Sequence, residues 1–366
     1  MKRGRTARVL VFVGSYSQPV PHAPAAKGAG LSIFEVDLAT GRARTRFEDG
    51  SIRNPAYLCV DGARRLVYAV SELHDGSEGV VTALEFDDQY ASVLSRSELP
   101  TGGQIPSYVS IVDRQYLLVS NYGDGSLVSF GLSPSGQLAS RASQVWIYGS
   151  GPDPHRQDGP HAHCVTPHPR NGRIYAADLG ADKLIELDLD IASGALAIDQ
   201  EYALTPGSGP RHLAFDSSGS VALLVSELSS RISVWGVGRD GSLQKLQDLA
   251  MLPADCAVTS FGADVALTAD GVKAFASNRG HDSIASYERT PSGNFRVAGW
   301  QPTGATPRSI ALTPDDEHLL VANQDADSIQ IYRVTTDQGL VDELAIAVGT
   351  PSYVHCIEDE LGRDVA

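Results

Sequence analysis

Two histidines close together in the chain have a spacing suited to proton transfer. His161 and His163 are two residues apart, so in a β-strand both side chains would point to the same side. Asp178, near the end of the next predicted strand, could orient one of the two imidazoles. Because an imidazole titrates near neutral pH, this arrangement favours general acid–base chemistry. The alternative is a hydrogen-bonded core histidine with no catalytic role.

Arginines and a glutamate at comparable places elsewhere in the chain indicate anion chemistry. Arg211, Glu227 and Arg279 each follow or end a short apolar segment, and Arg308 lies in the same position as Arg211 in a later segment. Guanidinium groups match carboxylates, phosphates and oxyanions. These residues are therefore candidates for holding an anionic substrate or a developing negative charge. Arg211 could instead pair with Glu227 and join two strands.

A loop insert, SGPDPHRQDGPHAHC, leads into the two histidines and carries Arg156 and Gln157. Extended loops beside a binding site commonly act as lids or contact ligands. Arg156 and Gln157 are therefore candidates for substrate binding. The alternative is a surface loop with incidental charge.

The candidate residues correspond to one another because one phrase is repeated seven times, about every 50 residues. Each copy begins with a proline or its replacement, and continues through an apolar strand, a Gly/Asp/Asn turn and a second strand. The copies begin at Asn54-Pro55, Ile105-Pro106, Gly159-Pro160, Gly209-Pro210, Phe261-Gly262, Thr306-Pro307 and Thr350-Pro351. A third and a fourth short strand follow, and four strands per period indicate the blades of a β-propeller.

The chain ends predict how the propeller closes. Only half a unit precedes Asn54, and only the opening half-phrase, Pro351 to Ile357, remains at the C-terminus. Together they would complete one blade and remove the open sheet edges of a linear array. We therefore expect an all-β, seven-bladed β-propeller forming a single domain over residues 8–358, with flexible tails at 1–7 and 359–366.

Aligning the copies produces columns in which some residues stand out. The third residues after the proline are Leu58, Val109, His163, Leu213, Val265, Ile310 and Val354. The polar column that ends the second strand reads Ser15, Glu72, Asn121, Asp178, Glu227, Asn278 and Asn323. His163 breaks an apolar column, and Arg279 follows the polar one where uncharged residues are usual. One mouth of the axis is thus predicted to carry the binding groups, with Asn278 and Asn323 mostly structural.

Composition limits the function and the location. The net charge of −15 argues against nucleic acid, which needs a basic surface, but permits a small anionic substrate. The apolar run Val9 to Val13 is too short for a signal peptide, and no stretch approaches a membrane span. The cysteines are isolated, with no CxxC, so we expect a cytoplasmic, disulfide-free protein with no membrane or nucleic-acid partner. A monomer or a homodimer is expected.

Taken together, these phrases resemble the β-propeller lactonase family, which includes propeller-type 6-phosphogluconolactonases and fungal muconate-lactonising enzymes. The resemblance rests on Val13-Gly14-Ser15-Tyr16 with Gly30-Leu31, RQDGPHAHCVTPHP with AADLGADKL, GPRHLAF with VSEL, SNRGHDSI, and TPRSIAL with VANQDADSI. It implies lactone chemistry at a channel mouth without a metal, with His163 or His161, Arg211, Glu227 and Arg279 in that role. Phe261-Gly262-Ala263-Asp264 departs from the pattern because it lacks the proline.

The predicted function is hydrolysis of an anionic, sugar-type lactone resembling 6-phosphogluconolactone, with no cofactor or metal. Glu227 or His163 would act as general base and the other as proton donor, while Arg211 and Arg279 hold the anionic group. A muconate-type lactonising enzyme is one alternative. A calcium-dependent lactonase using Glu72, Asn121, Asp178 and Asn323 is another, and a non-catalytic interaction scaffold is the third.

Overall fold

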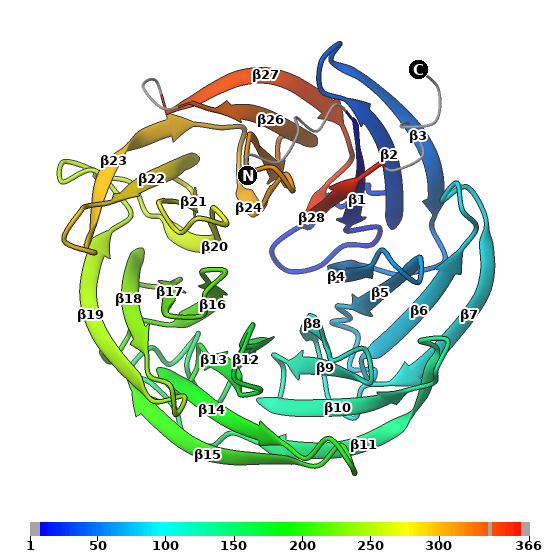
Figure 1. Cartoon of the computed structure of the whole chain (residues 1–366), viewed down its shortest axis with the longest axis horizontal. Helices are drawn as coiled ribbons and strands as arrows, with labels where there is room; N and C mark the ends of the chain where they lie inside the picture. The colour runs from blue at the N-terminus through cyan, green and yellow to red at the C-terminus, as the bar shows by residue number, and fades with distance from the viewer. Residues whose placement is uncertain (1–7, 336–338, 360–366) are drawn as a thin grey trace.

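Seven four-stranded antiparallel sheets surround a central axis in the computed structural model, which describes residues 8–335 and 339–359 (Figure 1). No helix is assigned among these residues. The prediction of an all-β, seven-bladed β-propeller is confirmed. The single domain expected over 8–358 stays a prediction. The tails expected at 1–7 and 359–366 lie outside the described residues, apart from Asp359.

In every blade the strands follow one another outward from the axis. The blade that joins the chain ends contains, from the innermost strand to the outermost, β28 (Pro351–Glu358), β1 (Arg8–Ser15), β2 (Leu31–Asp37) and β3 (Arg42–Asp49). The next two contain β4 (Pro55–Asp61), β5 (Leu66–Ser71), β6 (Val80–Phe86) and β7 (Val93–Pro100), then β8 (Pro106–Val112), β9 (Tyr116–Asn121), β10 (Ser126–Leu132) and β11 (Leu138–Trp146).

The remaining four blades follow in chain order. They contain β12 (Ala162–Pro167), β13 (Ile174–Asp178), β14 (Lys183–Leu189) and β15 (Leu196–Ala203); β16 (Pro210–Phe215), β17 (Val221–Ser226), β18 (Arg231–Val237) and β19 (Leu243–Ala250). The last two contain β20 (Phe261–Leu267), β21 (Lys273–Arg279), β22 (Ser283–Arg289) and β23 (Phe295–Pro302), then β24 (Pro307–Leu312), β25 (His318–Asn323), β26 (Ser328–Val334) and β27 (Leu340–Ala347).

Burial along the strands explains why the blades stack. The second strand of a blade is covered on both faces, so β5 (LVYAVS), β9, β17 and β25 are buried at every residue. The outermost strand β7 alternates between half-buried and exposed residues, as expected for a strand with one face in water. Because neighbouring blades share their apolar clusters, no blade buries its faces alone.

The chain closes as predicted. β1 pairs with β28 in antiparallel register, with Val13 opposite Val354 and Val11 opposite Cys356. This pairing removes the open edges that a linear array of blades would present. None of the described residues belongs to a helix with the length and apolar character needed to span a bilayer.

A bulge near the start of each inner strand directs one residue out of the pairing register. The bulged residues, which have no partner on the second strand, are Ala56, Ser107, His163, Arg211, Arg308, Ser352 and the pair Ala263–Asp264. Bulges of this kind re-aim side chains and are frequent beside functional sites. In this ring each blade therefore places its bulged residue at the same end of the central axis.

Candidate active site

A cavity of ≈ 440 Å³ lies at this end of the axis, lined by inner strands and by the residues that follow second strands. Its charged lining residues are Arg156, Arg211, Arg279, Arg308, Glu72 and Glu227. Four guanidinium groups thus face two carboxylates, an excess of positive charge in a protein whose net charge is −15. Such a local excess attracts anions.

In six of the seven blades, one backbone hydrogen bond shows which residues are structurally equivalent. The residue after the second strand donates its N–H to the carbonyl just before the inner strand. The donors are Tyr16, Glu72, Tyr122, Leu179, Glu227 and Gln324. Glu72 and Glu227 therefore lie one position beyond Asn121, Asp178 and Asn323, and the polar column inferred from sequence was misaligned for both glutamates. Arg279 occupies the same position as Glu72 and Glu227, because the residue before it, Asn278, pairs with Gly262 at the start of the inner strand.

The sequence alignment of the histidines was also wrong by two residues. Leu179 donates its N–H to the carbonyl of His161, so His161 corresponds to the residue before the proline in other blades. Ala162 takes the place of the proline, and the apolar column continues with Val165, opposite Ala176. His163 therefore does not break an apolar column. It occupies the bulge that holds Arg211 and Arg308 in their blades, which is why it lines the cavity.

Glu227 binds three of the four cavity arginines. Its Oε2 lies 2.9 Å from Arg211 Nε and 2.8 Å from Arg279 Nη2, and its Oε1 lies 2.5 Å from Arg156 Nη2. Burial alone would raise the pKa of Glu227, but Arg279, Arg211 and Arg156 hold it well below its usual range. Glu227 is therefore an anion that fixes the guanidinium groups of three separate segments.

The arginines remain protonated in spite of their burial. Burial and the neighbouring Arg279 lower the pKa of Arg211 to about 10, still above neutral pH. Arg211 Nη1 also donates to the carbonyl of Ala263. Arg156 lies in the predicted loop insert, with its guanidinium carbon 6.0 Å from the centre of the Phe261 ring. The insert thus contributes a cation to the cavity.

His163 is a buried, neutral imidazole beside these cations. Burial, followed by the charge of Arg211, lowers the pKa of His163 well below its usual value. Its ring contacts Tyr122 and His212 edge-on, at centroid distances of 5.4 and 5.2 Å. Its Nδ1 has no hydrogen-bond partner among the described residues. Since buried polar atoms are normally satisfied, this atom marks His163 as a group with unused hydrogen-bonding capacity.

His212 and Asp264 belong to the site and were missed by the sequence reasoning. His212 Nδ1 lies 2.8 Å from Asp264 Oδ1, and the carboxylate also accepts bonds from Ser309 and Ile310. Burial and Arg211 lower the pKa of His212 to about 4. A neutral His212 must donate from Nδ1 to the carboxylate, so Nε2 is left to accept from Arg211 Nη1 at 3.3 Å. The pair therefore positions Arg211.

Three of the predicted binding residues lie outside the cavity lining. His161 stacks on Tyr122 and its Nδ1 lies 2.8 Å from the Tyr122 carbonyl. Gln157 is buried and donates to the carbonyl of Leu179 at 2.8 Å, which anchors the insert. The Asp178 carboxylate accepts the N–H of Ala181 at 2.6 Å, and burial raises its pKa to about 6. His161 and Gln157 thus contact neighbouring residues of the site, whereas Asp178 holds the turn after β13.

Glu72 and Arg308 form the other charged part of the cavity. Tyr16 donates its hydroxyl to Glu72 Oε2 at 2.7 Å, and Arg308 Nη2 lies 3.9 Å from the same oxygen. The Arg308 guanidinium carbon is 5.4 Å from the centre of the Tyr16 ring. Of the four residues considered for calcium, only Glu72 lines the cavity. Asn121, Asp178 and Asn323 are the last residues of β9, β13 and β25 and do not line it.

Comparison with known proteins identifies the family. The family described as "Lactonase, 7-bladed beta-propeller" matches residues 10–357. The chain belongs to this family. The family resemblance and the lactonase class predicted from the sequence are thereby confirmed.

Similar proteins extend over nearly the whole chain. A 6-phosphogluconolactonase of Formosa agariphila is 29% identical over 343 residues, covering 91% of this chain and 95% of the relative. One of Bacillus subtilis is 28% identical over 355 residues, covering 96% and 98%. The solved structure of the periplasmic gluconolactonase of Pseudomonas aeruginosa has a TM-score of 0.87 at 27% identity, covering 95% of this chain and 99% of that one. These lactonase-family members share the propeller from end to end.

Proposed function

We propose that this lactonase-family member hydrolyses an anionic, sugar-type lactone of the 6-phosphogluconolactone kind in the cavity around Glu227. The excess of guanidinium groups at the cavity carries the proposal, since it occurs in a chain of net charge −15. A phosphate or carboxylate on the substrate would be the natural partner for such a group of arginines. The names of two similar proteins, 6-phosphogluconolactonases, support the same substrate class.

Arg211 and Arg279 are suited to hold negative charge because each already binds one carboxylate oxygen. Both approach Glu227 Oε2, at 2.9 and 2.8 Å. The substrate carbonyl or its anionic group would lie on the cavity side of the same guanidinium groups. Arginines fixed in advance stabilise a developing oxyanion without reorganising during the reaction. Arg308 would supply a further cation for a phosphate group.

His163 is the better general base of the two candidates considered. Glu227 forms ion pairs with three arginines through both of its carboxylate oxygens, so neither oxygen is free of a cation. His163 is neutral, lines the cavity and retains hydrogen-bonding capacity. It would accept a proton from water as the water oxygen bonds to the lactone carbonyl carbon. The same proton would pass to the ring oxygen as the ester C–O bond breaks.

A turnover panel tests the proposal. The purified protein is assayed with 6-phosphogluconolactone, gluconolactone and muconolactone, with spontaneous hydrolysis subtracted. We expect the highest kcat/KM for the phosphorylated lactone. Equal or faster turnover of neutral gluconolactone would contradict an anion-specific site. Preference for muconolactone would favour the muconate-type alternative, and no turnover of any lactone would favour a scaffold.

A second experiment tests the residues. Arg279→Ala, in protein shown to be folded, should lower kcat/KM by about 10²–10³-fold, as removal of one oxyanion donor does in other enzymes. An undiminished rate would remove Arg279 from the mechanism. Activity in the presence of a strong chelator would separate this mechanism from a calcium-dependent one.

The cytoplasmic location, the oligomeric state and the lack of nucleic-acid and membrane partners stay predictions.

A further inference from the structure

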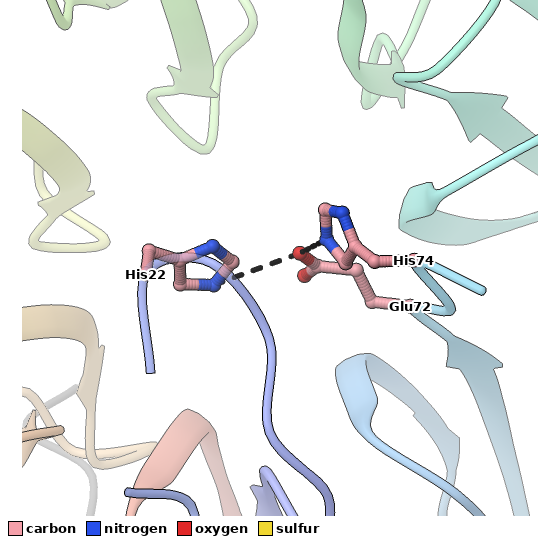
Figure 2. Close-up of side chains that lie close together, drawn as sticks. All are labelled: His22, Glu72 and His74. Atoms are coloured by element: carbon pink, nitrogen blue, oxygen red, sulfur yellow. Dashed lines mark hydrogen bonds and ion pairs between the residues drawn. The ribbon is translucent and has the colours of Figure 1, made fainter. Parts of the chain in front are cut away.

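A group of two histidines and one glutamate forms a second cluster at the cavity, apart from the Glu227 cluster. Figure 2 shows the imidazoles of His22 and His74 on either side of the Glu72 carboxylate. Glu72 Oε1 lies 2.9 Å from His74 Nε2 and 3.6 Å from His22 Nε2. One ligand atom from each of the three residues lies within 4.8 Å of the other two. The proposed hydrolysis uses none of these residues.

The cluster joins two segments that are distant in the sequence. Glu72 and His74 directly follow β5, whereas His22 lies in the loop between β1 and β2. Figure 1 shows this loop extending into the central opening of the ring, and Pro21 and His22 line the cavity. Gln324 donates to the carbonyl of His22 at 3.0 Å, which fixes the loop over the mouth. The three side chains therefore connect this loop to the second blade.

The surroundings fix the orientation of the Glu72 carboxylate toward the two histidines. Tyr16 donates to Glu72 Oε2, and this bond holds the carboxylate with Oε1 directed at the histidines. The Glu72 carboxylate accepts the hydrogen bond from His74 Nε2 at 2.9 Å, so zinc binding would displace the proton on that nitrogen.

We propose that His22, Glu72 and His74 bind a zinc ion that clamps the β1–β2 loop over the cavity mouth. Two imidazoles and one carboxylate are a ligand set that suits zinc, and calcium prefers oxygen ligands alone. Tyr16 is the outer-shell partner that orients the carboxylate, a role commonly found behind metal-binding groups. The fourth coordination position would face the cavity. The hydrolysis proposed above needs no metal, so this inference goes beyond it.

The geometry allows the ion with small movements. At zinc–ligand distances of about 2.0–2.1 Å, ligand atoms in a tetrahedral site lie about 3.4 Å apart. The two measured separations, 2.9 and 3.6 Å, lie on either side of that value. The side chains of His22 and His74 are 33% and 25% exposed, so both rings have room to adjust. The ion would replace the hydrogen bond between His74 and Glu72.

Zinc binding by the full-length protein tests the proposal. Protein purified in a chelator and then freed of it is titrated with zinc chloride by calorimetry, for the wild type, His74→Ala and His22→Ala. His155→Ala is the matched control, because His155 is an exposed histidine outside the cluster. We expect one zinc ion per wild-type and control chain. Each ligand variant should lose more than about 100-fold in affinity, since loss of even an outer-shell partner costs about 10–100-fold.

Two further measurements make the result decisive. Circular dichroism and thermal unfolding establish that each variant is folded. If His74→Ala does not fold, His22→Ala, in an exposed loop position, provides a second variant. Hydrogen exchange of residues 17–29 should slow when zinc is added to the wild type and not when it is added to His74→Ala. Equal zinc affinity in the wild type and both ligand variants would overturn the proposal. Neither result depends on turnover, so the proposed hydrolysis stands or fails separately.

Discussion

Glu72 and Glu227 occupy the same position in two different blades, yet their neighbours give them different chemistry. Each follows the second strand of its blade and donates its N–H to the carbonyl before the inner strand. Each is buried, with 4% and 3% of its surface exposed. Glu227 contacts three arginines, whereas Glu72 contacts Tyr16, two histidines and, at 3.9 Å, Arg308. The backbone places both glutamates at the same position, and the side chains around each of them, from its own blade and from other blades, determine its chemistry.

This difference shows how a repeat protein can place two kinds of site in one cavity. A carboxylate among guanidinium groups fixes cations and leaves their outer faces for an anion. A carboxylate between two imidazoles combines with them into a set of metal-binding groups. The bulge position behaves in the same way, because it carries alanine or serine in some blades and His163, Arg211 or Arg308 in others. If the two clusters are independent, changes in one should leave the chemistry of the other intact.

The largest expected difference is in the loss of kcat/KM when one histidine of each cluster, His163 or His74, is replaced by alanine. His163→Ala should lower kcat/KM for the preferred lactone by about 10²–10⁴-fold, the usual contribution of a positioned general base. His74→Ala, assayed without added metal, should change it by less than about 10-fold, because His74 has no part in the proton transfer. Steady-state kinetics on folded variants measure both. Similar losses in the two variants would show that one mechanism uses both clusters.

Exchange of each glutamate for its amide compares the two positions directly. Glu227→Gln should lower kcat/KM by roughly 10²-fold, because three arginines lose the anion that fixes them. Glu72→Gln keeps an acceptor for Tyr16 and leaves the arginines of the Glu227 cluster in place, so its effect should be several-fold smaller. The variants are compared with the same lactone at saturating and limiting concentrations. A larger loss from Glu72→Gln would reverse the assignment of the two clusters.

The fold could be predicted almost completely from the sequence. The period, the Gly/Asp turns and the half units at the two chain ends depend on local backbone conformation, which each copy specifies for itself. The site was predicted less securely, because residues were aligned on the proline of each copy. Pro160 stands two residues before the position of the other prolines, since Ala162 begins β12. His163 was therefore selected for a reason that the structure does not support, although it does line the cavity.

Other residues of the cavity had no signal in the repeat. His22 and His74 lie in loops that differ from blade to blade, so no column contains them. His212 precedes an apolar residue in GPRHLAF and pairs with Asp264 across two blades. Asp264 lies in the one copy that lacks the proline, where the sequence alignment was weakest. Contacts between blades depend on the closed ring, and a linear alignment of repeats does not contain that information.

The pH dependence of kcat/KM should show whether the catalytic histidine has a lowered pKa or an ordinary one. The active form of His163 is the neutral imidazole, and burial and Arg211 lower its pKa well below the usual value. A lower pKa keeps the base neutral at lower pH, so the acid limb of kcat/KM should have its midpoint below pH ~6.5, the ordinary value for histidine. The profile is measured between the pH limits of folded protein. A midpoint at or above the ordinary value would contradict the assignment of His163 as the base.

The smallest effect expected is on stability, and it tests whether Glu72 is held as an anion. Tyr16 and Tyr68 are both fully buried, and each donates one hydrogen bond of 2.7 Å, Tyr16 to the Glu72 carboxylate and Tyr68 to the carbonyl of Gly136. Hydrogen bonds to charged groups contribute about 1.5–3 kcal/mol, and neutral ones about 0.5–1.5 kcal/mol. Tyr16→Phe should therefore lower the free energy of unfolding in urea by more than Tyr68→Phe does at neutral pH. Equal losses would mean that Glu72 is protonated, which would remove the anionic ligand from the proposed zinc site and end its contrast with Glu227.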